Sequence, residues 1–175
     1  TIQILALFQH LKKQKDIQSP VFLVVAPTTL LFNWENEIRK FLPDMEHKLH
    51  WGGKRDTNTD SWKEQDIILT SYGTLTSDIG WIKDFPFTVA VLDESQSIKN
   101  PASLRFKAVN LLQAAYRFAL TGTPIENNTM ELFAQIQFVN PGFLGTQNFF
   151  KQEYAVPIDK NNDKQKRESL KQLVK

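Results

Sequence analysis

Residues 87–96 read Phe-Thr-Val-Ala-Val-Leu-Asp-Glu-Ser-Gln and are the most informative segment of the chain. Residues 87–92 are apolar except for one threonine, which is the composition of a β-strand covered on both faces. Two carboxylates, Asp93 and Glu94, follow this strand directly. In an open parallel sheet, ligands bind beyond the carboxyl ends of the strands. The junction between the strand and the acidic pair is therefore the first candidate for a functional site.

Strands and helices alternate on both sides of this segment. Apolar residues recur at helical spacing between the strands, and this spacing predicts helices. Two such stripes are Ile4, Leu7, Phe8 and Leu11, and Leu104, Ala108, Leu111 and Ala115. We expect strands at residues 21–26, 49–51, 67–69, 87–92 and 116–120. Strands that alternate with helices predict an α/β fold with three layers, a mainly parallel sheet between two layers of helices.

The composition excludes several classes of protein. The 175 residues, 41% of them hydrophobic, suit one compact domain. The net charge of +2 is too small to indicate a nucleic-acid partner by itself. The absence of cysteine excludes disulfides and thiolate metal sites, and it fits a reducing compartment. No apolar run approaches the roughly 18 residues that a membrane-spanning helix needs, so no membrane partner is expected.

Short polar segments follow four of the predicted strands. Their residues are small, hydroxylic or acidic, and the carboxyl ends of parallel strands share one edge of a sheet. We therefore expect all four segments to lie along one rim. They are Pro27-Thr28-Thr29, Thr70-Ser71-Tyr72-Gly73, Asp93-Glu94-Ser95-Gln96 and Thr121-Gly122-Thr123-Pro124.

The acidic pair has two interpretations. In magnesium-assisted phosphoryl transfer, one carboxylate holds the ion and its neighbour orients or deprotonates the attacking water. In the structural alternative, Asp93 caps a turn and Glu94 is solvated, which is commoner for an isolated Asp-Glu pair. Here the preceding buried strand and the other rim segments favour the catalytic interpretation.

The hydroxylic segments also have two interpretations each. Residues 27–29 and 71–73 offer hydroxyls and amides near helix N-termini, which are donors that phosphate backbones accept. Helix capping is the alternative for both segments, and a simple turn is the alternative for residues 121–124. Trp34 and Trp51 could stack on bases, although Trp34 lies at helical spacing with other apolar residues and fits a core position better.

The order of these motifs resembles the first RecA-like lobe of a superfamily-two motor of the Swi/Snf type. The resemblance covers residues 1 to about 154 and includes the Ile98-Lys99-Asn100 continuation of the Asp-Glu box and the Asn33-Trp34 element. One departure is Ser95, where the family more often has alanine. The other matching segments are Thr1-Ile2-Gln3, residues 25–30, Trp51-Gly52-Gly53-Lys54-Arg55, residues 68–75 and residues 120–127.

The resemblance implies a DNA-dependent ATPase that uses ATP and Mg²⁺ and tracks along double-stranded DNA. It implies magnesium ligation by Thr1 and Asp93, activation of water by Glu94, and coupling of nucleotide state to DNA by Gln96 and the turn at residues 121–124. A second RecA-like lobe of the same protein is the other implied partner, and the implied location is the nucleoid-associated cytoplasm or the nucleus. The resemblance also implies contacts with ATP by Gln3, Thr121, Gly122 and Thr123. It implies contacts with nucleic acid by Pro27, Thr28, Thr29, Ser71, Tyr72 and Gly73.

We expect residues 1–140 to form this lobe and residues 141–175 to form a helical and polar extension toward the second lobe. By resemblance, the lobe lacks its phosphate loop and the first strand, so the chain alone should hydrolyse ATP negligibly. The strand at 116–120 should then expose one edge, which favours self-association. The tail at 160–175 either contacts DNA or, as its polar composition favours, forms a solvated linker.

Other functions remain open on sequence alone. One is a scaffold module that binds DNA or protein without turnover, and others are a lobe of a restriction-type translocase or of an RNA helicase. The intact pair of Asp93 and Glu94 argues against the scaffold. Ile98-Lys99-Asn100 and Asn33-Trp34 favour the Swi/Snf type over the other motors.

Overall fold

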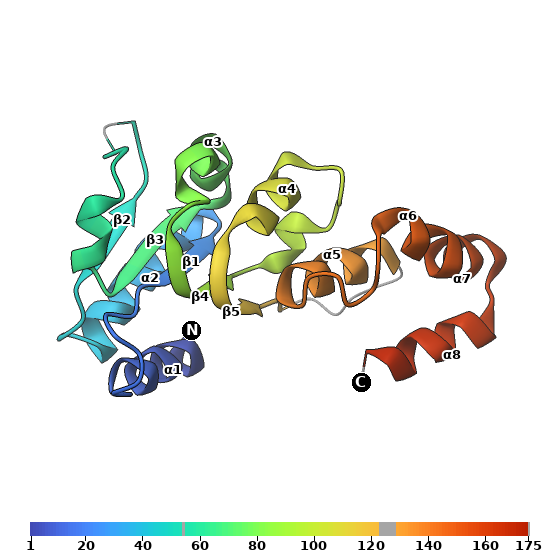
Figure 1. Ribbon diagram of the computed structural model, residues 1–175, viewed down its shortest axis with the longest axis horizontal. Coiled ribbons are helices and arrows are strands. Elements are labelled where there is room, and N and C mark those ends of the chain that lie inside the picture. The colour runs from blue at the N-terminus through green and yellow to red at the C-terminus, as the bar shows by residue number, and fades with distance from the viewer. Residues whose placement is uncertain (54, 123–128, 175) are drawn as a thin grey trace.

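Five strands form one sheet in the order β2-β3-β1-β4-β5, and every pairing in it is parallel (Figure 1). The computed structural model describes residues 1–53, 55–122 and 129–174. The sheet confirms the parallel arrangement expected from the alternation of strands and helices. The strands are β1 (Phe22–Ala26), β2 (His47–His50), β3 (Ile67–Ser71), β4 (Pro86–Leu92) and β5 (Gln113–Ala119).

The register of the central strands brings their carboxyl ends to one edge. Val25 of β1 pairs with Thr70 of β3 on one side and with Leu92 of β4 on the other. All five residues of β1 and of β3 are buried, as expected of strands covered on both faces. The polar segments that follow β1, β3 and β4 therefore emerge side by side.

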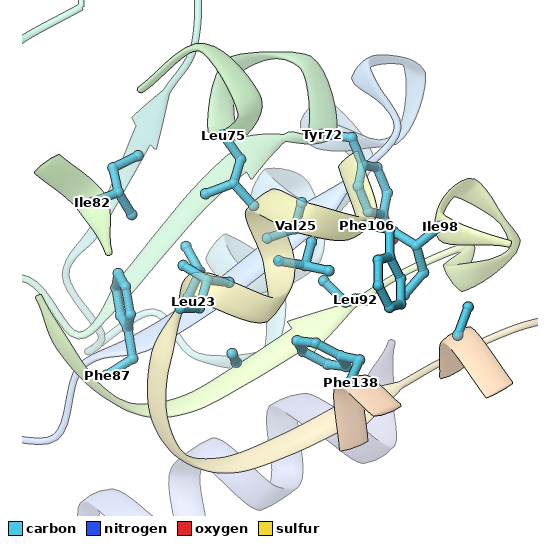
Figure 2. Close-up of a cluster of buried hydrophobic side chains, with 14 of the residues drawn as sticks. Leu23, Val25, Tyr72, Leu75, Ile82, Phe87, Leu92, Ile98, Phe106 and Phe138 are labelled. Atoms are coloured by element: carbon cyan, nitrogen blue, oxygen red, sulfur yellow. The ribbon is translucent and has the colours of Figure 1, made fainter. Parts of the chain in front are cut away.

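Helices cover both faces of this sheet and confirm the three layers. On one face, α1 (Ile2–Lys12) and α2 (Thr28–Phe41) pack against alternate residues of β1, such as Phe22 and Val24. On the other face, α3 (Tyr72–Ile82) and α4 (Leu104–Leu111) pack against Leu23 and Val25. Figure 2 shows this second cluster, in which Leu75, Phe106 and Phe138 meet side chains of β1 and β4.

The face that α4 buries differs from the one expected from its apolar stripe. Leu104 and Leu111 are 69% and 54% exposed, whereas Phe106 and Val109 are buried together with Ala108, the one residue of the expected stripe that faces the core. The helix ends at Leu111, and Ala115 lies in β5, which begins three residues earlier than expected. Because the row that contains Phe106 and Val109 carries the larger aromatic side chain, it buries more apolar area than the expected stripe.

Strand β5 forms one edge of the sheet. It pairs with β4, and no strand of the described residues pairs with its other side. Its side chains are exposed or half-buried, and Tyr116 is 54% exposed. The open edge expected for residues 116–120 is thus present.

The chain beyond β5 is helical and packs on the same core. Phe133, Phe138, Phe150 and Leu170 belong to the buried cluster that also contains α3 and α4. Figure 1 shows these helices leading away from the β5 side of the sheet. They are α5 (Thr129–Val139), α6 (Gln147–Phe150), a π-helical turn at Lys151–Ala155, α7 (Val156–Asn161) and α8 (Lys164–Leu173).

The expectation of a solvated linker at 160–175 is wrong. The Asp163 side chain accepts hydrogen bonds from the backbone amides of Gln165 and Lys166 and so caps α8. Leu170 is buried, and Lys166 forms an ion pair with Glu153. The polar composition of the tail reflects a helix with one buried contact row, which composition alone does not distinguish from a linker. Among the helices that the structure describes, each is too short or too polar to cross a membrane.

Candidate active site at the carboxyl edge of the sheet

Asp93 continues the hydrogen bonding of β4 and fixes the first carboxylate of the site. Its backbone N–H donates to the carbonyl of Val25, at 2.8 Å. Its Oδ1 accepts the Glu94 amide at 3.0 Å, and its Oδ2 accepts the indole Nε1–H of Trp34 at 2.7 Å. A carboxylate has about four acceptor positions, so both oxygens keep further capacity toward the rim.

Glu94 adopts a left-handed backbone conformation, with φ 50° and ψ 55°. A residue other than glycine pays roughly 1–3 kcal/mol for such a conformation, and strain of this kind concentrates at functional sites. The Glu94 Oε2 accepts a hydrogen bond from Gln96 Nε2 at 2.5 Å. The second carboxylate is therefore held by its strained backbone and by a neighbouring amide.

Gln96 connects the acidic pair to the segment after β5. Its Oε1 accepts the hydroxyl of Thr121 at 3.1 Å, while its Nε2 donates to Glu94. The backbone reinforces this link, because the Ser95 amide donates to the carbonyl of Leu120 at 2.8 Å. The structure thus brings together three residues expected at the rim. Gly122 is exposed beside them, and Thr123 lies outside the described residues.

Ser71 and Tyr72 serve the protein itself through their side chains. Ser71 accepts the Thr74 amide at 3.1 Å and caps α3, which is the alternative considered for it. The buried hydroxyl of Tyr72 donates to the backbone carbonyl of Asp93 at 2.8 Å. Burial raises the pKa of Tyr72 far above its usual value, so the phenol remains a donor. Of this segment, Gly73 is exposed.

The remaining candidates lie at the starts of two helices on the other face. Thr28 and Thr29 are exposed in the first turn of α2, whose N-cap residue, Pro27, provides no side-chain cap. Thr1 and Gln3 are exposed at the start of α1. Among the described residues, the structure shows no hydrogen bond between these four side chains and Asp93 or Glu94. Their assignment therefore still rests on the sequence.

The donor set at the rim fits Mg²⁺. Magnesium is usually held by one or two carboxylates, with water and substrate phosphates completing its shell. Asp93 and Glu94 are half-buried, and within residues 1–53, 55–122 and 129–174 neither forms an ion pair. The same residues contain no cluster of three or more His, Asp or Glu side chains that could hold a metal without a substrate.

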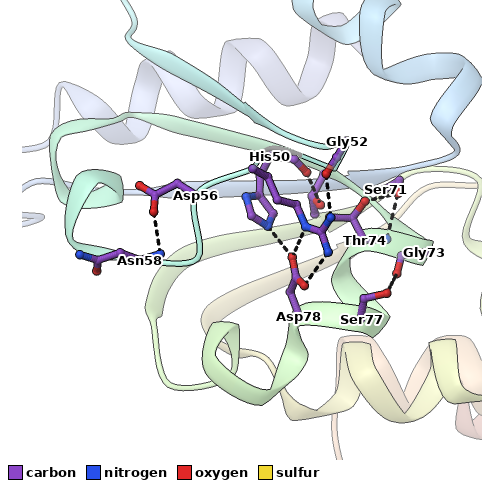
Figure 3. A network of polar contacts seen from close by, with 11 residues as sticks. His50, Gly52, Asp56, Asn58, Ser71, Gly73, Thr74, Ser77 and Asp78 are labelled. Atoms are coloured by element: carbon purple, nitrogen blue, oxygen red, sulfur yellow. Dashed lines mark hydrogen bonds and ion pairs between the residues drawn. The ribbon is translucent and has the colours of Figure 1, made fainter.

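A second polar cluster lies beyond β2 and was not anticipated from the sequence. The Arg55 guanidinium donates to both oxygens of Asp78 in α3, at 2.5 and 2.8 Å, and to the carbonyl of Gly52 at 2.7 Å. His50 Nε2 lies 2.8 Å from Asp78 Oδ2, and Figure 3 shows the two side chains facing each other. The hydrogen bond from Arg55 lowers the pKa of Asp78, and burial lowers the pKa of His50. The glycine-rich stretch that ends in Arg55 was the available signal.

Comparison with known proteins identifies the family. The model of the SNF2-related domain matches residues 1–175. The chain belongs to this family. The resemblance to the Swi/Snf type of helicase-like ATPase is therefore confirmed.

SNF2-related relatives extend from bacteria to plants. The putative ATP-dependent helicase/translocase YwqA of Bacillus subtilis is 35% identical over the whole chain, and the match spans 19% of YwqA. The chromatin-remodeling ATPase INO80 of Arabidopsis thaliana is 35% identical, over 91% of this chain and 11% of INO80. The chain thus corresponds to less than a fifth of each of these two relatives.

Solved structures of SNF2 ATPases share the fold. The Sulfolobus solfataricus SWI2/SNF2 ATPase core in complex with dsDNA is 40% identical, with a TM-score of 0.87. The match covers 98% of this chain and 35% of that one. At this identity and TM-score, the α/β sheet described above has the RecA-like fold of that core.

Proposed function

We propose that this chain is the ATP-hydrolysing side of the first motor lobe in an ATP-dependent double-stranded DNA translocase. The observation that carries the proposal is the hydrogen-bonded series Glu94–Gln96–Thr121, beside a fixed Asp93 at the end of β4. This series joins a carboxylate to the segment after the neighbouring strand. It provides a direct physical link between the place of hydrolysis and a second rim segment.

In this proposal the two carboxylates have different tasks. Asp93 would hold Mg²⁺ through its free acceptor positions, with the Thr1 hydroxyl as a further ligand. When bound, Mg²⁺ would neutralise charge on the β- and γ-phosphates of ATP. Glu94 keeps its Oε1 to orient water and take its proton. The water oxygen then bonds to the γ-phosphorus as the bond to the bridging oxygen breaks, which yields ADP and phosphate.

The other rim residues would hold the nucleotide and the polymer. Gln3 and the 121–123 turn would contact ATP, while the exposed Thr28, Thr29 and Gly73 would contact DNA phosphates. The amide of Tyr72, at the start of α3, would contribute there instead of its buried side chain. Duplex DNA is favoured over RNA because the similar Sulfolobus core was solved with dsDNA. A DNA substrate places the protein in the nucleoid-associated cytoplasm or the nucleus.

A second lobe is part of this proposal. The chain spans 35% of the similar SWI2/SNF2 cores, which leaves room for another lobe in proteins of that length. We assign residues 1–140 to the first lobe and residues 141–175 to a helical extension toward its partner. An arginine supplied across such a lobe interface is worth roughly 10³ to 10⁵ in rate. The isolated chain should therefore turn ATP over negligibly.

ATP hydrolysis by the full-length protein tests the proposal. The rate is measured with no nucleic acid, duplex DNA, single-stranded DNA and RNA, at matched nucleotide concentrations. We expect the largest stimulation with duplex DNA. Equal stimulation by RNA would favour an RNA helicase, and ATP binding without turnover under every condition would favour the scaffold.

The open edge of β5 supports a separate expectation for the isolated 175 residues. Its unpaired backbone groups can pair with a second copy, so the isolated chain should self-associate. Sedimentation velocity at increasing concentration measures this directly. A monomer that persists at high concentration would contradict this expectation.

A further inference from the structure

Asp93 directly follows β4, and side chains from two helices also hold it in place. The indole of Trp34, in α2, donates to the Oδ2 of Asp93 at 2.7 Å. The phenol of Tyr72, the first residue of α3, donates to the Asp93 carbonyl at 2.8 Å. These helices lie on opposite faces of the sheet, because α2 packs against one face of β1 and α3 against the other. Helices from both layers therefore form hydrogen bonds with Asp93.

Both helices begin at the segments proposed to contact DNA. Helix α2 starts at Thr28, and Trp34 follows six residues later, which is less than two helical turns. Helix α3 starts at Tyr72, next to the exposed Gly73. A displacement at the start of either helix would therefore reach Asp93 through one rigid, buried aromatic ring. Close-packed interiors transmit such displacements because they contain little free space.

Burial of the Trp34 indole does not by itself require its hydrogen bond to Asp93. Trp62 is buried as completely, at 0% exposure against 2% for Trp34, yet its Nε1 has no hydrogen-bond partner in the described part of the chain. This fold therefore tolerates an unpaired indole in its core. The Trp34 N–H nevertheless points at a carboxylate, and a hydrogen bond to a charged acceptor is roughly twice as strong as a neutral one.

We propose that Trp34 and Tyr72 are positioning residues that couple contact with duplex DNA to the orientation of Asp93. This coupling is distinct from the Glu94–Gln96–Thr121 series, because it acts on the other carboxylate and comes from the starts of α2 and α3. It rests on the proposed function, since it assigns the route by which DNA affects the same site.

The test compares Trp34→Phe with Trp62→Phe in the full-length protein. Both changes remove the same atoms from a buried tryptophan, but one of them also removes a hydrogen bond to Asp93. The ratio of the duplex-stimulated to the basal ATPase rate should fall at least about tenfold in Trp34→Phe, the size expected for losing a hydrogen bond to a charged group. In Trp62→Phe the ratio should stay within about twofold of wild type.

A binding measurement supplies a readout that does not depend on turnover. In the Glu94→Gln background, the duplex Kd is measured without ATP and with saturating ATP and Mg²⁺. The ratio of the two Kd values is the coupling between the sites, and it must be reciprocal. Trp34→Phe should bring this ratio toward one, and Tyr72→Phe should shift it in the same direction by about threefold. Trp62→Phe should leave it unchanged.

The outcomes separate the two claims. If wild type shows no duplex stimulation, the proposed function fails and this inference fails with it. If wild type is stimulated and Trp34→Phe matches Trp62→Phe in both ratios, Trp34 is only a core residue and the inference is overturned. Should Trp34→Phe not fold, β-(3-benzothienyl)alanine at position 34 replaces the N–H with sulfur at nearly the same volume and carries the same expectation.

Discussion

Two clusters of charged side chains lie beyond the carboxyl ends of strands in this lobe, and they differ in charge balance. Beyond β2, the Asp78 carboxylate receives two hydrogen bonds from Arg55 and a third contact from His50. Beyond β4, Asp93 receives its hydrogen bonds from neutral donors, the Trp34 indole and a backbone amide. In the first cluster, formed by Arg55, Asp78 and His50, the carboxylate is neutralised, and we call it the closed cluster. The second, the pair Asp93 and Glu94, remains negatively charged, and we call it the open cluster.

This difference separates the structural role of Asp78 from the catalytic role proposed for Asp93 and Glu94. A carboxylate that is paired with a guanidinium has few acceptor positions left for a ligand. Removal of the guanidinium would leave a poorly compensated charge. The Asp78 cluster therefore serves to hold the Gly52 loop against α3. A pair of unneutralised carboxylates is costly unless a cation joins it, and this supports the Mg²⁺ site proposed at Asp93 and Glu94.

The largest expected effect comes from neutralising the open cluster. Asp93→Asn keeps an oxygen that can accept the Trp34 N–H but removes the charge that holds the metal. Duplex-stimulated turnover in the full-length protein should fall by at least about 100-fold, while the thermal midpoint stays the same or rises. Steady-state ATPase assays and calorimetry measure the two quantities. A clear loss of stability would mean that Asp93 is structural, like Asp78.

Neutralising the closed cluster should have the opposite result. Asp78→Asn leaves Arg55 without its carboxylate and keeps only one oxygen to accept hydrogen bonds from Arg55 and His50. The thermal midpoint should fall by about 5–10 °C, as expected for breaking a partly buried pair in a domain of this size. Asp60→Asn is the matched control, because Asp60 pairs with Lys63 at the surface and both side chains are largely exposed. An equal response of the two variants would contradict the comparison.

Acid should destabilise the closed cluster through His50. Burial lowers the pKa of His50 below the ordinary value of 6.5, so the unfolded chain takes up a proton that the folded chain does not. The stabilisation is complete above pH 6.5 and declines as the pH falls below it. Chemical denaturation between pH 7.5 and 5 should show this slope, and His50→Gln, which keeps a donor for Asp78, should flatten it. A slope unchanged by the substitution would assign the acid sensitivity elsewhere.

The smallest expected effect comes from Ser95, which follows Glu94 directly in the chain. Ser95 is fully buried, and its hydroxyl has no partner among the residues that the structure describes. Ser95→Ala removes an unsatisfied polar group, so it should be neutral or stabilise the fold by about 1 kcal/mol. Urea denaturation of wild type and variant measures the change. Destabilisation by the same amount would show that the hydroxyl is hydrogen-bonded in solution.

The sequence predicted the arrangement of the rim better than its contacts. The apolar runs at 21–26 and 87–92 placed the polar segments correctly, because a buried parallel strand has a distinctive local composition. Local periodicity does not say which of two neighbouring rows packs inward, and in α4 only Ala108 of the expected row is buried. The contacts of Trp34 with Asp93 and of Arg55 with Asp78 join residues 59 and 23 positions apart. Such contacts follow from tertiary packing and leave no local pattern.

We expect the unneutralised carboxylates beyond β4, Asp93 and Glu94, to perform DNA-stimulated ATP hydrolysis. The most direct measurement is the ATPase rate of full-length Glu94→Gln with saturating duplex DNA, beside wild type and the surface control Glu168→Gln. We expect Glu94→Gln to bind ATP but to lose about 10² to 10⁴ in rate, the range for removing a general base, while Glu168→Gln matches wild type. A stimulated rate in Glu94→Gln equal to that of the control would show that Glu94 is not the general base.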